Sequence, residues 1–184
     1  TPPVPLDVTE AVAGGYSLAD HLRDGTAARL IDEGRWDWVV LQEQSLQPTM
    51  ASGRFMASLR RLDERIRAVH ARTALFALPP RLDWHQDTQV VQRAYISAAA
   101  EVGATLVPVG AAWSSALAER PRLDLYQADG YHPRPAGTYL GACVFYATLT
   151  GKSPEGLPPR AGSIALAPDL ALELQHAARL AAGK

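Results

Sequence analysis

An acid and an imidazole lie three residues apart in the stretch DGYHP, where Asp129 precedes His132 at the boundary between a polar turn and an apolar helical run. Gly130 relaxes the backbone between them, so the carboxylate can reach the nearer imidazole nitrogen. A carboxylate in that position fixes the tautomer and stabilises the imidazolium, which leaves the farther nitrogen free to act as a base. The pair therefore predicts the acid–base half of a nucleophilic hydrolase. The competing interpretation is that Asp129 caps the following helix and His132 is a surface residue, which is the commoner meaning of an arbitrary D-x-x-H.

The other four histidines give weaker signals. His85 follows Trp84 in the stretch RLDWHQD, where an aromatic and a polar side chain could line a substrate cleft, although an ordinary surface loop fits the same pattern. His21, His70 and His176 lie in expected helices. No pair of histidines has H-E-x-x-H or another metal-binding spacing, so we predict neither a metal nor a cofactor.

The composition of the 184 residues favours a single globular domain over residues 1–184. Hydrophobic residues make up 47% of the chain, which is enough for a substantial core. The formal net charge of −1 leaves no basic surplus for a phosphate backbone, so nucleic acid is not an expected partner. No apolar run is long enough to span a bilayer. Cys143, the only cysteine, lies in an apolar helical run and is expected in the core.

Patterns typical of strands and of helices alternate along the chain. Strands are expected over residues 4–13, 36–42, 73–78 and 104–109. Helices are expected over a loose apolar face at 18–31, over the clear stripe at 52–71, and over 90–102, 110–119, 135–150 and 168–182. This alternation indicates an α/β sandwich with a mainly parallel sheet.

Polar, Gly-rich and Pro-rich segments follow the expected strands. These segments are AGGYS, LQEQSLQP, ALPPRLDWHQD and, further along, ADGYHP. In folds of this class, ligands bind at the carboxyl ends of the strands. The functional site is therefore expected among these four segments.

The same segments resemble the sequence blocks of the SGNH/GDSL hydrolase superfamily. DGYHPRPAGTYLGA is similar to the C-terminal block, in which an Asp and a His three residues apart serve a serine nucleophile, and AGGYSLADHL is similar to the second block. WDWVVLQEQSLQP stands in the place of the third block, and LVPVGAAW resembles the approach to the Asp-His turn in one bacterial branch. The resemblance covers nearly all of the chain. It implies a flavodoxin-like three-layer α/β/α sandwich, with His132 as general base, Asp129 as its orienting partner and the Gly15 N–H in the oxyanion hole.

The third block departs from the family pattern G-x-N-D, whose Asn donates to the oxyanion. The matching loop is Gln42, Glu43, Gln44 and Ser45. A glutamine amide carries the same two N–H donors, so Gln42 or Gln44 is expected to take this role, and the sequence does not choose between them. The alternative is that these side chains only satisfy backbone groups of the loop.

The family's first block, a G-D-S or G-N-S turn that carries the nucleophile, has no counterpart before AGGYS. We therefore expect the first strand and the nucleophilic serine in sequence upstream of Thr1, and we expect the chain alone to be inactive. In the family topology this strand lies between residues 4–13 and 38–41, so without it both neighbours have unpaired ladder groups. Ser17 and Ser45 are alternative nucleophiles, but SLAD before an apolar helix is typical of an N-cap box around Ser17.

The resemblance implies a serine-type esterase that removes a short acyl group from a carbohydrate or similar alcohol, with a small-molecule or carbohydrate ester as its partner. Trp84, His85 and Tyr131 are candidate substrate-binding residues, and Trp113 is either part of a sugar platform or buried. The alternatives are a non-catalytic carbohydrate-binding domain of the same fold and a structural or interaction protein. The compartment is unknown, because any export signal would lie upstream.

Overall fold

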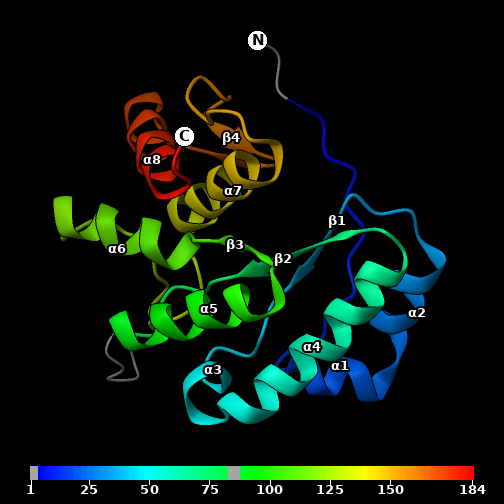
Figure 1. Ribbon diagram of the computed structural model, residues 1–184. Helices are drawn as coiled ribbons and strands as arrows, with labels where there is room; N and C mark the ends of the chain where they lie inside the picture. Colours follow the sequence, from blue (N-terminus) through cyan, green and yellow to red (C-terminus); the bar gives the residue numbers. More distant parts are fainter. Residues whose placement is uncertain (1–3, 83–87) are drawn as a thin grey trace. The chain divides into compact units, whose positions relative to one another are not determined.

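A computed structural model describes residues 4–82 and 88–184 (Figure 1). The contacts between residues divide this chain into two compact units. The sheet unit comprises residues 5–76 and 88–106, and the helix unit comprises residue 4 together with residues 77–82 and 107–184.

The fold is α/β, with a parallel three-stranded sheet of flavodoxin-like type, as the sequence predicted. Its strands are β1 (Trp38–Leu41), β2 (Arg72–Phe76) and β3 (Thr105–Val107), in the spatial order β1-β2-β3. β1 and β2 run parallel and in register from Trp38↔Arg72 to Leu41↔Leu75. β1 and β3 fall within ranges expected from the sequence, and β2 begins one residue before its expected range of 73–78.

Five helices belong to the sheet unit: α1 (Leu18–Asp24), α2 (Thr26–Glu33), α3 (Gln47–Met50), α4 (Ser52–Ala68) and α5 (Thr88–Val102). α4 packs on β2 and against α1, α2, α3 and α5. Its apolar stripe is the centre of the core, because the side chains of Phe55, Leu59, Leu62 and Ile66 are at most 1% exposed. The stripe at steps of three and four residues therefore predicted both the helix and its buried face.

The loose apolar face expected at residues 18–31 belongs to two helices, α1 and α2. Gly25 separates them with φ +82° and is the C-cap of α1. An L residue rarely adopts this left-handed conformation, whereas glycine does so at little cost. The glycine therefore ends the first helix, and the second begins at the next residue.

The helix unit contains α6 (Val109–Glu119), α7 (Pro135–Thr150) and α8 (Pro168–Ala181), which pack against one another. A short antiparallel hairpin of β4 (Arg160–Ala161) and β5 (Ile164–Ala165) packs on α7. The sequence predicted the three helices but not this hairpin, which lies in the Pro- and Gly-rich connection before α8. Cys143 of α7 is buried as expected, and burial raises the pKa of its thiol to about 12.

Residues 4–13 do not form the strand expected from their sequence. An extended segment becomes a strand only when its backbone pairs with a neighbour, and none of the described strands pairs with it. β1 is the end strand in the spatial order, and Val40 within it is 41% exposed. The apolar run of β1 is thus only partly buried, although its sequence is typical of a strand covered on both faces.

Among the residues that the structure describes, no helix combines the length and the hydrophobicity needed to cross a membrane.

Gly137 allows the start of α7 to pack closely on the rest of the helix unit. A Cβ at this position would lie 2.4 Å from Trp113 Cζ2 and 2.5 Å from the Leu125 carbonyl oxygen. We expect Gly137→Ala to lower the free energy of unfolding by about 1–3 kcal/mol, because a backbone oxygen cannot move aside as a flexible side chain would. Denaturant unfolding monitored by circular dichroism measures this change.

Gly141, one turn further along α7, is the matched control. A Cβ there meets Val109 Cγ1 at 3.6 Å, which is ordinary van der Waals contact. Gly141→Ala should be neutral or stabilise the protein by about 0.5–1 kcal/mol, because alanine favours a helix more than glycine does. Equal stability of the Gly137→Ala and Gly141→Ala variants would contradict the close approach at Gly137.

Candidate active site

His132 lies in a turn that connects residue 125 to α7. The backbone N–H of Arg134 donates to the Leu125 carbonyl at 2.8 Å, and the N–H of Gln127 donates to the His132 carbonyl at 2.8 Å. The chain therefore folds back on itself, and residues 125–134 form a closed hairpin-like loop, which we call the Asp-His turn.

Asp129 and His132 face each other across this turn. The distance between Asp129 Oδ2 and His132 Nδ1 is 2.6 Å. The other carboxylate oxygen accepts the N–H groups of Tyr131 at 3.1 Å and His132 at 3.0 Å. Gly130 makes the reversal possible with φ +75°. The His132 side chain is 55% exposed, and none of the described residues hydrogen-bonds to its Nε2, so this nitrogen is open to a reactant.

The hydrogen bonds of the turn keep Asp129 ionised. Its pKa is lowered to about 2, chiefly by the bond to the His132 ring and then by the N–H groups of His132 and Tyr131. Asp129 does not cap the following helix, since α7 begins at Pro135 with Arg134 as N-cap and has no side-chain cap bond. Its carboxylate contacts the imidazole and not the end of the helix, so the helix-cap interpretation of Asp129 is wrong.

The segment after β2 supports the Asp-His turn from the side. The N–H of Leu82 donates to the Gly130 carbonyl at 2.8 Å. The Tyr126 hydroxyl donates to the Pro80 carbonyl at 2.8 Å, and burial raises the pKa of this phenol to about 12. Two hydrogen bonds thus tie residues 80–82 to the turn.

Aromatic and cationic groups lie beside His132. The rings of Tyr131 and His132 have centroids 4.1 Å apart, and the Arg81 guanidinium carbon lies 3.9 Å from the centroid of the Tyr131 ring. Tyr131 is 39% exposed, so its expected role in substrate binding stays a prediction. Trp84 and His85 lie outside the described residues.

Trp113 is not part of an exposed sugar platform, because it is only 2% exposed. Its ring packs edge-to-face on Tyr126 with centroids 4.6 Å apart. The buried alternative is therefore the correct one for this residue, which supports the Asp-His turn from within the core.

The second group of expected site residues lies in the sheet unit, beginning with the Gly14–Gly15 turn before α1. Gly15 has φ +76° and is exposed, and within residues 4–82 and 88–184 no acceptor binds its N–H. The following residue is fixed by a hydrogen bond from the Tyr16 N–H to the Ala13 carbonyl at 3.2 Å. The turn thus presents a backbone donor to solvent.

Ser17 is the N-cap of α1, as its sequence context predicted. Its hydroxyl donates to Asp20 Oδ2 at 2.6 Å, and the Ser17 and Asp20 N–H groups complete a capping box. These bonds from Ser17 lower the pKa of Asp20. Ser17 is only 5% exposed, so its hydroxyl is committed to the cap and poorly placed to act as a nucleophile.

The loop after β1 carries the two glutamines. Gln44 Oε1 accepts the Leu46 N–H at 2.9 Å, which fixes the amide plane and leaves its NH₂ group as a donor. Gln42 is exposed, and its side chain makes no hydrogen bond with the described residues. Gln44 is therefore the better-oriented donor of the two.

Glu43 lies between the two glutamines and is 1% exposed. Sequence reasoning gave this residue no role. Its Oε1 accepts the backbone N–H groups of Leu18 at 3.1 Å and of Gln44 at 2.7 Å. The signal that could have identified it is a lone acid close behind a buried strand, since such a carboxylate needs backbone donors nearby. Glu43 thus joins the loop after β1 to the start of α1.

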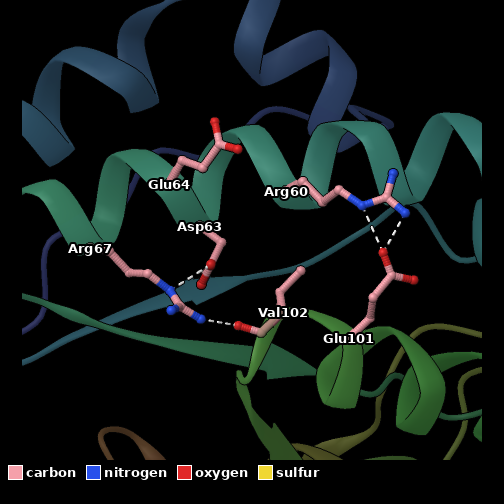
Figure 2. A pocket seen from close by; sticks show the side chains of 6 residues that line it. All are labelled: Arg60, Asp63, Glu64, Arg67, Glu101 and Val102. Carbon is pink, nitrogen blue, oxygen red and sulfur yellow. Dashed lines mark hydrogen bonds and ion pairs between the residues drawn. The ribbon is translucent and has the colours of Figure 1, made fainter.

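Two surface pockets, one in each unit, contain none of the expected site residues. The pocket of the sheet unit has a volume of about 280 Å³ and lies between α4 and α5 (Figure 2). Two ion pairs lie in its wall, with 2.7 Å between Arg67 Nε and Asp63 Oδ2 in one and Arg60 and Glu101 in the other. This surface is therefore a charge network between two helices.

The pocket of the helix unit has an acidic wall. Its lining residues are Glu119, Glu155, Asp169, Leu172, Glu173 and His176. Within the part of the chain that the structure describes, no three His, Cys, Asp or Glu side chains are grouped so that they could hold a metal ion.

The solved structures that are similar to this chain include the following two. A DUF4886 family protein from Bacteroides uniformis has a TM-score of 0.77 over 92% of this chain and 80% of its own, but at 20% identity it shows the fold alone. A protein from Slackia heliotrinireducens, described as a candidate SGNH hydrolase, is 30% identical, with a TM-score of 0.65 over 74% of this chain and 80% of its own.

The chain belongs to the SGNH hydrolase superfamily. No family model matches the sequence, and no curated protein matches it. Membership in the superfamily accounts for the α/β fold and is compatible with a small-molecule substrate. The roles of individual residues in this SGNH superfamily member follow from their geometry and are proposed below.

Proposed function

We propose that the protein is a serine-type ester hydrolase that removes a short acyl group from a carbohydrate or similar alcohol. The observation that carries this proposal is the 2.6 Å contact between Asp129 Oδ2 and His132 Nδ1, with the opposite ring nitrogen open. An imidazole oriented by a carboxylate in this way is the acid–base device of serine hydrolases. Superfamily membership supports hydrolysis as the type of reaction.

In the proposed reaction, His132 Nε2 takes the proton of a serine hydroxyl while the serine oxygen attacks the ester carbonyl. The imidazolium then gives this proton to the departing alcohol, and a water molecule hydrolyses the acyl-enzyme in a second cycle of the same kind. Asp129 remains ionised throughout and stabilises the imidazolium, in keeping with its lowered pKa.

The Gly15 N–H and the Gln44 amide are the proposed donors to the oxyanion. Both have a donor that no described residue occupies, and Gln44 is further oriented by its bond from the Leu46 N–H. Two such donors stabilise the tetrahedral intermediate more than the ground-state carbonyl. The order of these segments along the chain resembles the order of the superfamily's sequence blocks, which supports the two assignments.

A serine-directed phosphonate probe tests the proposal on the full-length protein. We expect one serine to be labelled, as measured by intact mass and peptide mapping, and we expect labelling to require His132. The proposal assigns the nucleophile to a serine other than Ser17 and Ser45. Ser17→Ala should therefore leave labelling intact, although it removes the α1 cap.

Two outcomes would contradict the proposal. Labelling at Ser17 or Ser45 would overturn the assignment of the nucleophile. A protein that binds sugars in a thermal-shift screen, yet is neither labelled nor able to hydrolyse p-nitrophenyl acetate, would be the non-catalytic carbohydrate-binding domain.

A further inference from the structure

Glu43 is a buried carboxyl group that the proposed reaction does not use. It lies two residues beyond the end of β1, and only 1% of it is exposed. A buried acid is costly unless it is hydrogen-bonded, and the two backbone N–H groups bound to Glu43 Oε1 lower this cost. The role of Glu43 therefore depends on the two backbone segments to which these N–H groups belong.

The two N–H groups belong to the two segments that present the proposed oxyanion donors. Leu18 is the first residue of α1, three residues after Gly15. Gln44 is itself a proposed donor, and its own backbone N–H is bound at 2.7 Å. A single carboxylate oxygen thus connects the start of α1 to the backbone of the glutamine loop, across 25 positions in the sequence.

We propose that Glu43 is a positioning residue of the oxyanion hole, which holds the Gly14–Gly15 turn and the Gln44 loop in one fixed arrangement. This inference rests on the proposed roles of Gly15 and Gln44. Glu43 does not touch the reacting atoms; it acts through the two backbone segments that it joins. Catalytic donors need this kind of support, because a small misplacement of a donor weakens its bond to the developing charge.

The pKa of the Glu43 carboxyl group is raised above its ordinary value, and burial is the main cause. Burial raises its pKa, the N–H groups of Gln44 and Leu18 lower it, the nearby Asp20 raises it, and Arg54 lowers it. Arg54 Nη2 also lies 3.8 Å from Asp20 Oδ1, so the two outer charges partly offset each other. Both the ionised and the protonated form of Glu43 retain an oxygen that can accept the two N–H groups.

Two substitutions separate the acceptor from the charge. Glu43→Gln keeps an oxygen at the same distance from the backbone and removes the charge, whereas Glu43→Ala removes the acceptor. Glu64 provides the control, because it lies exposed on α4 of the same unit and none of the described residues forms an ion pair with it. All variants are made in the full-length protein.

Amide hydrogen exchange, followed by NMR, gives a readout that is independent of activity. We expect Glu43→Ala to speed exchange at the Leu18 and Gln44 N–H groups by about tenfold or more, because each loses its hydrogen-bond acceptor. We expect kcat for p-nitrophenyl acetate to fall by about 10- to 100-fold with KM changed by less than about threefold, as for a loss felt only in the transition state. Glu43→Gln should restore both values to within about threefold of the unmodified protein, and Glu64→Ala should change neither.

Three results would overturn the inference. In the first, Glu43→Ala leaves exchange and kcat unchanged. In the second, it speeds exchange throughout α4 and β2, which shows a general loss of stability. In the third, Glu43→Gln loses activity while both N–H groups stay protected, so that the charge matters and the positioning does not. Failure of the proposed function looks different: the unmodified protein is then inactive, and the exchange measurement alone decides whether Glu43 joins the two segments.

Discussion

Replacing His132 by alanine is expected to reduce kcat/KM for a p-nitrophenyl ester by about 10³-fold or more, because the reaction loses both its general base and its general acid. The loss should appear in kcat, because the imidazole transfers protons in the transition state and contributes little to binding the substrate in the ground state. His132 is more than half exposed, so the variant should fold normally. Initial rates on the full-length protein measure the effect.

His176 is the matched control for this substitution. Its side chain is 51% exposed, and its Nδ1 lies 3.0 Å from Glu155 Oε1, so it is also a histidine paired with a carboxylate on the surface. His176→Ala should change kcat/KM by less than about twofold, because the residue lies outside the proposed site. If His132→Ala retains the rate of the unmodified protein, the mechanism proposed for the Asp-His turn is wrong.

Asp129→Asn is expected to lower kcat by about 10²- to 10⁴-fold while leaving the turn folded. An asparagine can still accept the N–H groups of Tyr131 and His132, but it cannot stabilise an imidazolium, and its NH₂ group favours the wrong tautomer of His132. The control is Asp124→Asn, which removes an exposed carboxylate 3.2 Å from Arg134 Nε on the same loop. A similar loss in both variants would show that the general charge of the loop matters and the contact to the imidazole does not.

The lowered pKa of Asp129 fixes how this defect depends on pH. The folded value is about 2, below the value of about 3.9 for a free aspartate. A depressed pKa means that the stabilisation by the carboxylate is complete above the free value and is lost only as the pH falls through about 2. Asp129 should therefore stay ionised between pH 5 and 9. Its titration should not change the ratio of the rate of the unmodified protein to the rate of Asp129→Asn across this range. A ratio that varies across this range in step with titration of a carboxylate would contradict the assignment.

Local patterns predicted the regular elements well where a single periodicity dominates. The stripe of Phe55, Leu59, Leu62 and Ile66 identified α4, and the apolar runs identified all three strands of the sheet. The error at residues 4–13 has a different origin, because a strand depends on a partner that the local sequence does not reveal. The break at Gly25 was visible as a glycine in the sequence, but its left-handed φ belongs to the folded chain.

The site could be predicted only as far as short-range geometry allows. The spacing of Asp129, Gly130 and His132 was enough to indicate a contact between carboxylate and imidazole, because three residues around a glycine have few ways to turn. The preference for Gln44 over Gln42 as the proposed donor needed the bond from the Leu46 N–H, and the proposed role of Glu43 needed its contact with Leu18. The contact between Glu43 and Leu18 joins segments 25 positions apart in the sequence, and no local pattern contains such a contact.

The only thiol of the chain is a built-in reporter of unfolding. Cys143 lies on α7, two residues after Gly141, and its sulfur is shielded from solvent with a pKa of about 12. A disulfide exchange reagent reacts with a thiolate, so it can modify this side chain only when the helix detaches and the group regains its ordinary acidity. The rate of modification at low denaturant therefore counts the opening events of this one helix, without any label or engineered probe.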